Sequence, residues 1–596
     1  MMRARLVALG LTTFVFAAPP SFAVQPSAPE PLISLDQEAG HSIRQILEAG
    51  TGAVARSNTE DLAALTAFYA AREDRPLWIE GNQLSLKARA AIAEISRAAD
   101  WGLVPSAFTL PAAITEGGSD AELRTRLAEA EVTLSLAVLQ YARHARGGRI
   151  SHPAKELSSY LDRKPQLKDP TSVLEEIAAA SEADAYLRDL HPKHPQFAKL
   201  RAALMKMRGS AEEAGNEDKQ VRLPARGPAL SLGTRHADVA LLRQRLEVPA
   251  QANEGEPETD DLFDKALQDA VKAFQREAGL SADGIVGRAT RTALNGDDPT
   301  SVTEASIIAN MEQWRWMPED LGRFHIAVNL PEYTIRVVRD GEVIHSERVI
   351  TGKTSKQTPV FSDEMSTVVF HPFWGVPDSI KVNELLPSLA RGGNALEKNN
   401  LRLQYKGRDV DPATIDWSQA DIRRFHVYQP PGRGNVLGQV KFMFPNRHQV
   451  YMHDTPTQNL FNSTQRTYSH GCVRVRNPLR LAELVLAEDK DWDAGKVQGV
   501  VRSGPQNNHV NLTQKVPVHM TYFTVVAKED GTLQSFPDVY GHEKRIRLAL
   551  EGRFDQIARH RDHLAPVAYD RSRYAAAKKP APEPITDLFS AIFGGF

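Results

Sequence analysis

The spacing of apolar residues changes near residue 306, and this change constrains the fold more than any other feature of the chain. Between residues 123 and 141, apolar side chains recur every three or four positions, which is the period of an amphipathic helix. From 324 to 330 and from 334 to 338 they alternate with period two, as in half-buried strands. We therefore expect a multidomain α+β protein with an all-α N-terminal part and a mostly-β C-terminal domain.

Capping residues and polar intervals divide the helical part. Ser119 and Glu122 have the spacing of a capping box, and Gly147 and Gly148 end the periodic run that follows. The segment 24–58 begins rich in proline, serine and alanine, and the interval 209–227 is polar, which is typical of linkers. The sequence thus predicts an all-α scaffold domain at 59–208, with linkers at 24–58 and 209–227.

A hairpin signal marks the start of the β-rich part. Asp340 and Gly341 stand between two alternating segments, and Asp-Gly is a favoured two-residue turn. A polar stretch with a helical start interrupts the strands between residues 382 and 427, and an excursion of this length is commonly a lid or a substrate-binding insertion. We expect a mostly-β domain at 306–545 with a helical lid insertion at 382–427. A partly disordered C-terminal tail is expected at 562–596.

The first residues have the three parts of a secretory signal peptide. Arg3 and Arg5 supply a positive start, an apolar run extends from Leu6 to Ala18, and small residues precede a cleavage site after Ala23. The run is shorter than the roughly 18 residues of a membrane-spanning helix. We expect a signal peptide at 1–23, no membrane span after its cleavage, and a mature protein that works outside the cytoplasm.

Overall composition excludes several classes of function. Lysine and arginine number 72 against 74 aspartate and glutamate residues, so the chain lacks the bulk positive charge that nucleic-acid binding requires. One cysteine and scattered histidines offer no familiar spacing of metal ligands. Composition therefore indicates no nucleic-acid partner and no metal site, and we expect chemistry without a cofactor.

Cys472 is the only cysteine among 596 residues. Exported proteins that use cysteine structurally pair it, so a single thiol favours a reactive role over the alternative of a small buried apolar side chain. A thiol is nucleophilic as thiolate and needs a nearby base or positive field. His453 can approach from a neighbouring strand, whereas His470 would point to the opposite face of a strand-like turn. Cys472 is thus a candidate acyl-transfer nucleophile, with His453 the preferred base.

A second motif lies at residues 270–294, AVKAFQREAGLSADGIVGRATRTAL. It contains Phe-Gln, Gly-Leu, Asp-Gly and Gly-x-x-Thr in an order that resembles the small three-helix peptidoglycan-binding module. We expect Thr290 to start the third helix, and an acidic loop from Glu254 to Asp261 separates the first two. The resemblance implies a peptidoglycan-binding-like domain at 228–297 and cell-wall glycan as a partner.

The surroundings of Cys472 resemble a second family. The runs SHGCVRV (469–475), YMHDTP (451–456) and QPPGRGNVLGQVKF (429–442) are similar to motifs of the L,D-transpeptidases, cell-wall enzymes that use a cysteine. The order of the predicted domains resembles that of the long periplasmic members of this family. The resemblance implies a catalytic β-sandwich at 306–545 and tetrapeptide stems of peptidoglycan as the substrate.

The resemblance also implies roles for individual residues. Cys472 is expected to be the nucleophile and His453 the base that accepts its proton. Asp454 is expected to orient the imidazole through either its carbonyl or its side chain. Backbone N–H groups around Gly471 and Cys472 are expected to stabilise the oxyanion of the tetrahedral intermediate.

Five further residues are expected around the substrate. Arg474 would face a substrate carboxylate or support the turn, because its planar guanidinium suits either role. His470 lies behind His453 as a candidate base, and Ser469 is expected to hydrogen-bond within the turn. Tyr451 shares a strand face with His453, and Trp374 resembles an aromatic residue that lines the site in this family. Trp314 and Trp316, in contrast, are predicted to lie in the core.

These implications define the expected reaction. Cys472 would take up the stem peptide as a thioester and release D-alanine, and an amine of a second stem would resolve the thioester into a 3→3 cross-link. Alternatives are an L,D-carboxypeptidase or hydrolytic cross-link-cutting relative, attachment of a protein to the wall, and a non-catalytic wall-binding protein. The resemblance further implies a periplasmic location and acylation of Cys472 by β-lactams of the carbapenem type.

Overall fold

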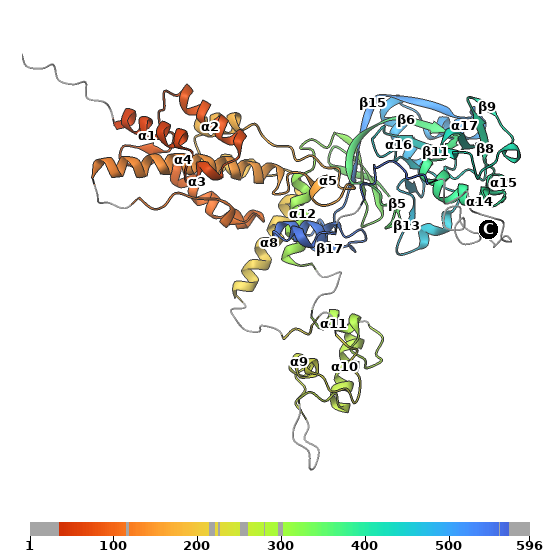
Figure 1. Cartoon of the computed structure of the whole chain (residues 1–596), viewed down its shortest axis with the longest axis horizontal. Coiled ribbons are helices and arrows are strands. Elements are labelled where there is room, and N and C mark those ends of the chain that lie inside the picture. Colours follow the sequence, from red (N-terminus) through yellow and green to blue (C-terminus); the bar gives the residue numbers. More distant parts are fainter. Residues whose placement is uncertain are drawn as a thin grey trace, which may run out of the picture.

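The computed structural model describes residues 35–114, 119–213, 221–224, 227–250, 260–278, 280–295, 302–558 and 561–570. The signal peptide predicted at 1–23, most of the acidic loop and the end of the predicted tail, 571–596, lie outside these residues. Figure 1 shows a helical part and a β-rich domain at opposite ends of the long axis, with a small three-helix unit set apart from both. Helices combined with a large mixed sheet confirm the predicted multidomain α+β class.

The helical part is organised around α4, Asp120–Gly147, and its predicted capping box is confirmed. The Ser119 side chain accepts the Glu122 N–H, and the Glu122 side chain accepts the Ser119 N–H. The elements around α4 are α1 (Leu35–Ala49), α2 (Thr59–Ala71), β1 (Ile79–Glu80), β2 (Gln83–Leu84), α3 (Leu86–Ser96), α5 (Pro153–Glu156), α6 (Pro170–Ala179), α7 (Ala183–Asp189) and α8 (Pro195–Glu213).

The structure corrects the linker predicted at 24–58. Helix α1 occupies residues 35–49 and packs along α4, and Ile43 is fully buried in the core that the two helices share. Ile43 and Leu47 are four residues apart and therefore lie on one face of α1. The proline-rich start of the segment outweighed this short amphipathic repeat in the prediction, so the helical part includes residues predicted to form a linker.

The small unit contains α9 (Ala237–Leu246), α10 (Lys265–Glu277) and α11 (Arg288–Leu294). Gln275 connects its motif residues, because its side-chain oxygen accepts the Gly284 N–H at 2.8 Å and its amide donates to Asp283 at 2.9 Å. The prediction that Thr290 starts the third helix is wrong, since α11 begins at Arg288 after Gly287. Thr290 is buried and hydrogen-bonds the Ile285 carbonyl at 3.2 Å instead of capping the helix.

The β-rich domain is built on one mixed, nine-stranded sheet in the order β13-β5-β14-β12-β11-β6-β15-β3-β4. Since β4 also pairs with β5, the sheet closes on itself, and both walls around its core belong to the same sheet. The predicted Asp340-Gly341 hairpin joins β4 to β5. The strands are β3 (Phe324–Asn329), β4 (Thr334–Arg339), β5 (Glu342–Gly352), β6 (Phe361–Phe370), β11 (Val440–Met443), β12 (Met452–His453), β13 (Thr467–Ser469), β14 (Val473–Val475) and β15 (Asn508–Thr521).

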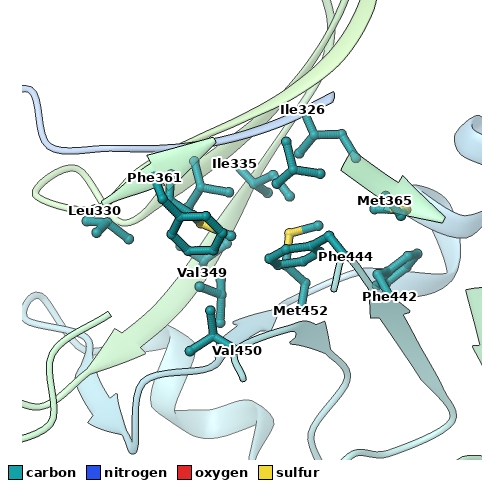
Figure 2. Close-up of a cluster of buried hydrophobic side chains, with 14 of the residues drawn as sticks. Ile326, Leu330, Ile335, Val349, Phe361, Met365, Phe442, Phe444, Val450 and Met452 are labelled. Carbon is teal, nitrogen blue, oxygen red and sulfur yellow. The ribbon is translucent and has the colours of Figure 1, made fainter. Parts of the chain in front are cut away.

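Buried apolar side chains fill the space inside this sheet. Figure 2 shows Ile326 and Ile335 from one wall directed toward Phe442, Phe444 and Met452 from the other. Outside the sheet lie α12 (Glu304–Arg315), α16 (Pro478–Lys490), α17 (Ala494–Ser503), α18 (His542–Leu550) and the hairpin of β16 (Val525–Ala527) and β17 (Leu533–Ser535). Within the described residues, no helix combines the length and apolarity that crossing a membrane requires.

The insertion predicted as a helical lid at 382–427 is larger and partly β. It contains a separate four-stranded sheet, β7-β10-β8-β9, and a hydrophobic core of its own that includes Leu385, Trp417 and Ile422. Its strands are too short for periodicity to reveal. They are β7 (Trp374–Gly375), β8 (Arg402–Tyr405), β9 (Arg408–Asp409) and β10 (His426–Gln429), and its helices are α13 (Asp378–Ile380), the π-helical η4 (Lys381–Leu385), α14 (Leu386–Leu389) and α15 (Ala395–Lys398).

The helical part and the β domain share buried surfaces. Phe197 and Leu200 of α8 pack with Met311 and Trp314 of α12 and with Phe523 beyond β15. Trp314 and Trp316 are both buried, as predicted. Residues 150, 157 and 161, which follow α4, join the core of the closed sheet. The helical part is therefore docked on the β domain through apolar contacts.

A buried carboxylate strengthens this junction. Glu312 of α12 accepts the backbone N–H groups of Arg149 at 2.6 Å and Ile150 at 3.0 Å, just after α4 ends. Gly148 makes this approach possible, because it has a φ of +83° and a Cβ at this position would lie 2.5 Å from the carboxylate oxygen. Burial raises the pKa of Glu312, and the Arg315 charge and the two N–H groups oppose this rise.

Replacing Glu312 by alanine should destabilise the junction. Glu312→Ala leaves two backbone N–H groups without their acceptor and the buried Arg315 guanidinium without its ion-pair partner, so we expect a loss of about 3 kcal/mol in the free energy of unfolding. Urea unfolding followed by tryptophan fluorescence would measure the loss. The matched control Glu529→Ala, at an exposed position, should change the value by less than about 0.5 kcal/mol. Equal effects of the two substitutions would contradict this account.

Candidate functional site

Cys472 lies on a tight turn between β13 and β14. Gly471, with a φ of +119°, adopts a backbone conformation that side-chain-bearing residues rarely reach. The Ser469 hydroxyl donates to the Cys472 carbonyl at 2.5 Å and accepts the Gly471 N–H at 3.2 Å, so its predicted role within the turn is confirmed. Thr358 adds a hydrogen bond to the Gly471 carbonyl at 2.8 Å. The turn therefore holds the thiol in a fixed direction.

The strand register gathers the other side chains around the thiol. β12 lies between β11 and β14, with Lys441 opposite His453 and His453 opposite Arg474. Directly opposite residues project from the same face of a sheet, and so do residues two apart on one strand. Tyr451 and Cys472 lie just before β12 and β14, two residues ahead of His453 and Arg474, and the Val473 N–H donates to the Tyr451 carbonyl at 3.1 Å, so this spacing brings both side chains to the side of the row.

His453 is buried, and the Asp454 main chain orients its ring. His453 Nδ1 hydrogen-bonds the Asp454 carbonyl oxygen, which can only accept, so Nδ1 carries the proton and Nε2 has the free lone pair. The Asp454 carboxylate is engaged elsewhere and accepts the N–H groups of Gln439 at 2.9 Å and Thr455 at 2.7 Å. Of the two possibilities left by the sequence, the carbonyl is the group that contacts the imidazole.

Burial and two cations keep His453 neutral. Burial lowers its pKa to about 3, and the positive charges of Arg474 and Lys441 add to this effect against the Asp454 hydrogen bond. At neutral pH the imidazole is therefore unprotonated at Nε2, the state that a general base must have before the reaction. The hydrogen bonds of the described residues include none between His453 and the thiol, so a substrate or a small movement must bring the two groups together.

Opposing effects act on the Cys472 thiol. Burial raises its pKa, while hydrogen bonds from the Tyr451 backbone and hydroxyl and the positive charges of Lys441 and Arg474 lower it. Lys441 lies with its ammonium group 4.0 Å from the centre of the Tyr451 ring. Arg474 is buried and donates to the Thr457 hydroxyl at 3.0 Å. The positive field that a thiolate needs is therefore built into the sheet.

The two aromatic residues predicted at the site, Tyr451 and Trp374, both lie close to the Cys472 thiol. The Tyr451 ring lies 5.6 Å from that of His453 in an edge-on arrangement. Its hydroxyl is hydrogen-bonded to the Cys472 sulfur and to the Trp374 side chain. Since an indole can only donate, Trp374 directs the Tyr451 hydroxyl proton toward the sulfur. Tyr451 thus has its hydroxyl between the Trp374 indole and the thiol, and this contact favours the thiolate form of Cys472.

His470 is turned toward the insertion. Its Nε2 lies 2.8 Å from a carboxylate oxygen of Glu384 on η4. This contact occupies the Nε2 nitrogen that a base would use, and it connects the turn around Cys472 to the insertion. His470 is thus less suited than His453 to accept the thiol proton.

A cavity of about 690 Å³ opens over the cysteine. Seven of the predicted site residues line it, namely Trp374, Tyr451, His453, Ser469, His470, Cys472 and Arg474. The insertion contributes residues 375–380, and the C-terminal segment contributes His563 to Val567. A hollow of similar size, about 720 Å³, lies beside α18 and is lined by no cysteine or histidine. The first cavity is therefore the candidate active site.

Sequence reasoning missed three contributors to the site. Lys441 lies in the motif at residues 429–442, which we compared only as a whole. Its place between the apolar residues Val440 and Phe442 indicated that its side chain lies on the other face of the strand. Glu384 and His563 come from the insertion and the tail, where no pattern indicated a contact with the cysteine turn. Among the described residues, no group of three or more potential ligands is arranged to hold a metal ion.

Comparison with known families gives three matches along the chain. Residues 63–204 match a scaffold domain, 235–294 a peptidoglycan binding domain, and 323–502 the L,D-transpeptidase catalytic domain. A Haemophilus influenzae protein whose name assigns it to the L,D-transpeptidases is 35% identical over 278 residues, which is 45% of this chain. The chain spans only 55% of the length of that relative.

Solved structures give weaker similarities. The crystal structure of an L,D-transpeptidase from Xylanimonas cellulosilytica is 17% identical, with a TM-score of 0.14, and covers 50% of this chain and 100% of its own. That of an L,D-transpeptidase from Stackebrandtia nassauensis is 14% identical, with a TM-score of 0.15, and covers 49% of this chain and 94% of its own. At such low TM-scores neither structure supports an argument about this chain.

Removing the Lys441 charge should make the thiol less reactive. In Lys441→Met, the thiolate loses one of its two neighbouring cations, so we expect a higher thiol pKa and roughly tenfold slower alkylation of Cys472 by iodoacetamide at neutral pH. The pH dependence of the alkylation rate measures both changes. Lys515→Met, which removes an exposed lysine that pairs with Glu364, serves as the matched control. An unchanged profile in Lys441→Met would rule out this role.

Proposed function

We propose that the chain forms 3→3 cross-links in peptidoglycan through a thioester on Cys472, because its residues 323–502 match the L,D-transpeptidase catalytic domain and a relative that is 35% identical bears that name. The observation that carries this proposal is the arrangement inside the cavity. A fixed thiol shares one sheet face with an imidazole whose Nε2 is free and with two cations. These groups match the needs of acyl transfer by cysteine.

In the first step, Cys472 attacks the carbonyl carbon of the third residue of a tetrapeptide stem. His453 Nε2 accepts the thiol proton, the C–S bond forms, and the carbonyl electron pair moves onto oxygen. When this tetrahedral intermediate collapses, the C–N bond breaks and His453 returns the proton to the departing D-alanine amine. The product of this step is a thioester on Cys472 and free D-alanine.

The Cys472 N–H is the best candidate donor to the oxyanion. Among the described contacts it has no acceptor, whereas the Gly471 N–H already donates to Ser469. One such donor contributes about 3 kcal/mol to the stabilisation of a transition state. The Gly471 N–H would add to it if the 3.2 Å bond to Ser469 were exchanged for one to the oxyanion.

The charges of the groups around Cys472 are consistent with attack by the thiol and proton transfer to His453. The low pKa of His453 keeps the imidazole neutral before the reaction, so its Nε2 is unprotonated when substrate arrives. Lys441 and Arg474 then offset the negative charge that develops on sulfur and oxygen. Arg474 could also face a stem carboxylate, because it lines the cavity.

In the second step, the side-chain amine of a diamino acid on another stem attacks the thioester. His453 takes a proton from the incoming amine, and the Cys472 thiolate leaves and is reprotonated. The energy of the original peptide bond is conserved in the thioester, so the step consumes no nucleotide. Water in place of the amine would give an L,D-carboxypeptidase, and the same site would then act as a hydrolase.

The other parts of the chain fit a cell-wall enzyme. The peptidoglycan binding domain at 235–294 would hold the glycan near the cavity. The insertion is proposed as a lid over the bound stem, since its residues 375–380 line the cavity. A cell-wall substrate requires a location outside the cytoplasm, and with the signal peptide expected at 1–23 we propose the periplasm.

Substitution of His453 tests the assignment of the base. His453→Ala should slow acylation of Cys472 by a carbapenem by about 10² to 10⁴-fold, the usual contribution of a positioned base. Intact-protein mass spectrometry over time measures the rate. His470→Ala is the matched control and should retain most of the rate, because His470 pairs with Glu384. The opposite result, with a fast His453→Ala and a slow His470→Ala, would transfer the base role to His470.

Product masses test the reaction itself. Incubation with a disaccharide tetrapeptide should give a cross-linked dimer that has lost one D-alanine, and Cys472→Ala should abolish it. Release of D-alanine with a tripeptide as the only other product, even with excess amine acceptor, would favour the hydrolytic alternative. Cross-linking that survives in Cys472→Ala would overturn the proposed function.

A further inference from the structure

The C-terminal segment returns to the cavity that contains Cys472. We call residues 561–570 the C-terminal strap. Five of them, His563 to Val567, line the cavity together with Cys472 and His453. Leu564 remains 37% exposed although it is apolar. The strap thus adds an apolar surface to one side of the site.

The far end of the strap is attached to the insertion. The Tyr569 hydroxyl donates to the Ala420 carbonyl at 3.1 Å, and the Arg423 guanidinium lies 4.7 Å from the centre of the Tyr569 ring. Val567 and Tyr569 also pack against the apolar core of the insertion. The strap therefore continues the cavity wall that the insertion begins.

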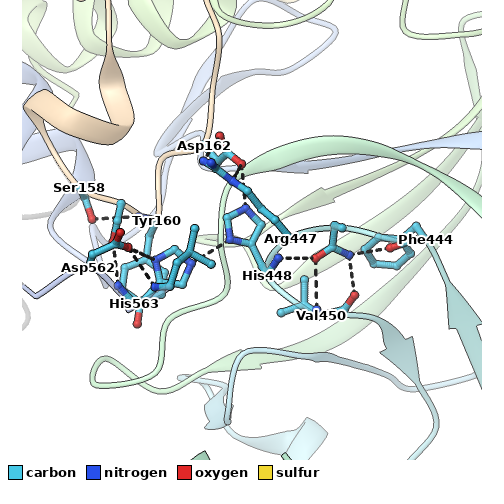
Figure 3. A network of polar contacts seen from close by, with 12 residues as sticks. Ser158, Tyr160, Asp162, Phe444, Arg447, His448, Val450, Asp562 and His563 are labelled. Carbon is cyan, nitrogen blue, oxygen red and sulfur yellow. Dashed lines mark hydrogen bonds and ion pairs between the residues drawn. The ribbon is translucent and has the colours of Figure 1, made fainter. Parts of the chain in front are cut away.

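Its near end is held by a chain of polar contacts, which Figure 3 shows from Asp162 through His448 to His563. The Asp162 carboxylate lies 2.9 Å from His448 Nε2, and His448 Nδ1 lies 2.8 Å from His563 Nε2. His563 Nδ1 lies 2.8 Å from the Ser159 hydroxyl. The His563 ring also stacks on Tyr160, with centres 4.0 Å apart. The strap is thus tied both to the helical part and to the loop before β12.

The side-chain hydrogen bonds from Ser159 through His563 and His448 to Asp162 all donate in the same direction, toward the carboxylate. A carboxylate only accepts, so His448 Nε2 carries a proton and its Nδ1 accepts one from His563 Nε2. His563 Nδ1 then accepts from the Ser159 hydroxyl, which in turn accepts the His563 backbone N–H at 3.2 Å. Every bond is satisfied with both imidazoles neutral. This series of hydrogen bonds therefore anchors the strap at defined donor and acceptor atoms.

The loop that contains His448 leads directly into the site. Residues 447–451 all line the cavity, and two residues later the same chain supplies His453. Asn446 fixes this loop, because its amide donates to the Phe444 carbonyl at 2.6 Å and to the Val450 carbonyl at 2.8 Å. The anchor of the strap is therefore connected to the strand that positions the base.

We propose that the C-terminal strap is the outer wall of the donor-peptide cleft, with His563 as the positioning residue that holds it against the bound stem. This inference rests on the proposed function, because the ligand is the stem peptide of that reaction. The apolar side chains of Leu564, Pro566 and Val567 would contact the aliphatic parts of the stem. The wall would contribute to donor affinity and not to the chemical step.

Acidic conditions should loosen this wall. Burial lowers the pKa of His563 to about 4, assisted by His448 and Arg447 and opposed by Asp562 and Asp162. Burial also lowers the pKa of His448, against the Asp162 hydrogen bond. When the strap is released, these histidines return to an ordinary pKa of about 6.5. The strap is therefore held most firmly above about pH 6.5 and less firmly as the pH falls toward about 4.

Donor affinity without turnover tests the wall directly. In full-length Cys472→Ala protein, calorimetry measures the dissociation constant of a tetrapeptide stem, and His563→Ala is added to this background. We expect roughly tenfold weaker binding at pH 7.5, a loss typical of a few contacts. The difference should shrink as the pH falls from about 7.5 to 5, which a merely structural residue would not produce. His509→Ala, at an exposed histidine of β15, is the matched control.

A second variant keeps the test independent of folding. Ser159→Ala removes the hydroxyl that holds His563, and it should weaken donor binding in the same direction. In the presence of Cys472, His563→Ala should raise KM severalfold and leave kcat and the iodoacetamide alkylation rate within about twofold. Tighter binding in either variant would mean that the strap blocks the cleft, and unchanged binding would mean that it has no contact with the stem. Either result overturns the inference, whereas absence of D-alanine release by the unaltered protein would refute only the proposed function.

Discussion

The register between β11, β12 and β14 is the constraint on which the site depends. It places Lys441, His453 and Arg474 in one row, and it sets Tyr451 and Cys472 on the same face two residues earlier. A slip of one residue in any of these strands would turn its side chains to the opposite face. The core inside the closed sheet prevents such a slip, because Phe442, Met452 and Val473 point into it from the alternate positions. Packing on one face thus fixes the chemistry on the other.

This arrangement also explains how a partly buried thiol and a buried imidazole can react. Burial disfavours the charged form of both groups, so it raises the pKa of Cys472 and lowers the pKa of His453. The two neighbouring cations favour a thiolate and disfavour an imidazolium. The resting site therefore holds two neutral groups, and a proton moves only when substrate is present to share the charge. The insertion and the strap line the remaining sides of the cavity and would contact the bound substrate.

The sequence predicted the parts of this protein that depend on local pattern. The helical repeat after Ser119, the hairpin at Asp340-Gly341 and the turn around Gly471 follow from spacing and turn chemistry, and all three were found. Helix α1 was missed because a proline-rich stretch precedes it. The β strands of the insertion were missed because they are too short to alternate visibly.

The site residues divide in the same way. The residues predicted from the motifs around Cys472 line one cavity or border it, but whether Asp454 used its carbonyl or its carboxylate could not be read from its neighbours in sequence. Glu384 and His563 come close to the cysteine turn only through tertiary packing across 86 and more residues. No periodicity encodes such contacts, so they require the folded chain.

The central claim is that Cys472 carries the stem peptide. Its most direct test is a rapid quench of the full-length protein with a tetrapeptide donor, followed by intact-protein mass spectrometry and peptide mapping. The account predicts a transient adduct with the mass of the stem less its D-alanine, located on Cys472 and sensitive to hydroxylamine as a thioester should be. Release of D-alanine with the adduct on another residue would contradict it.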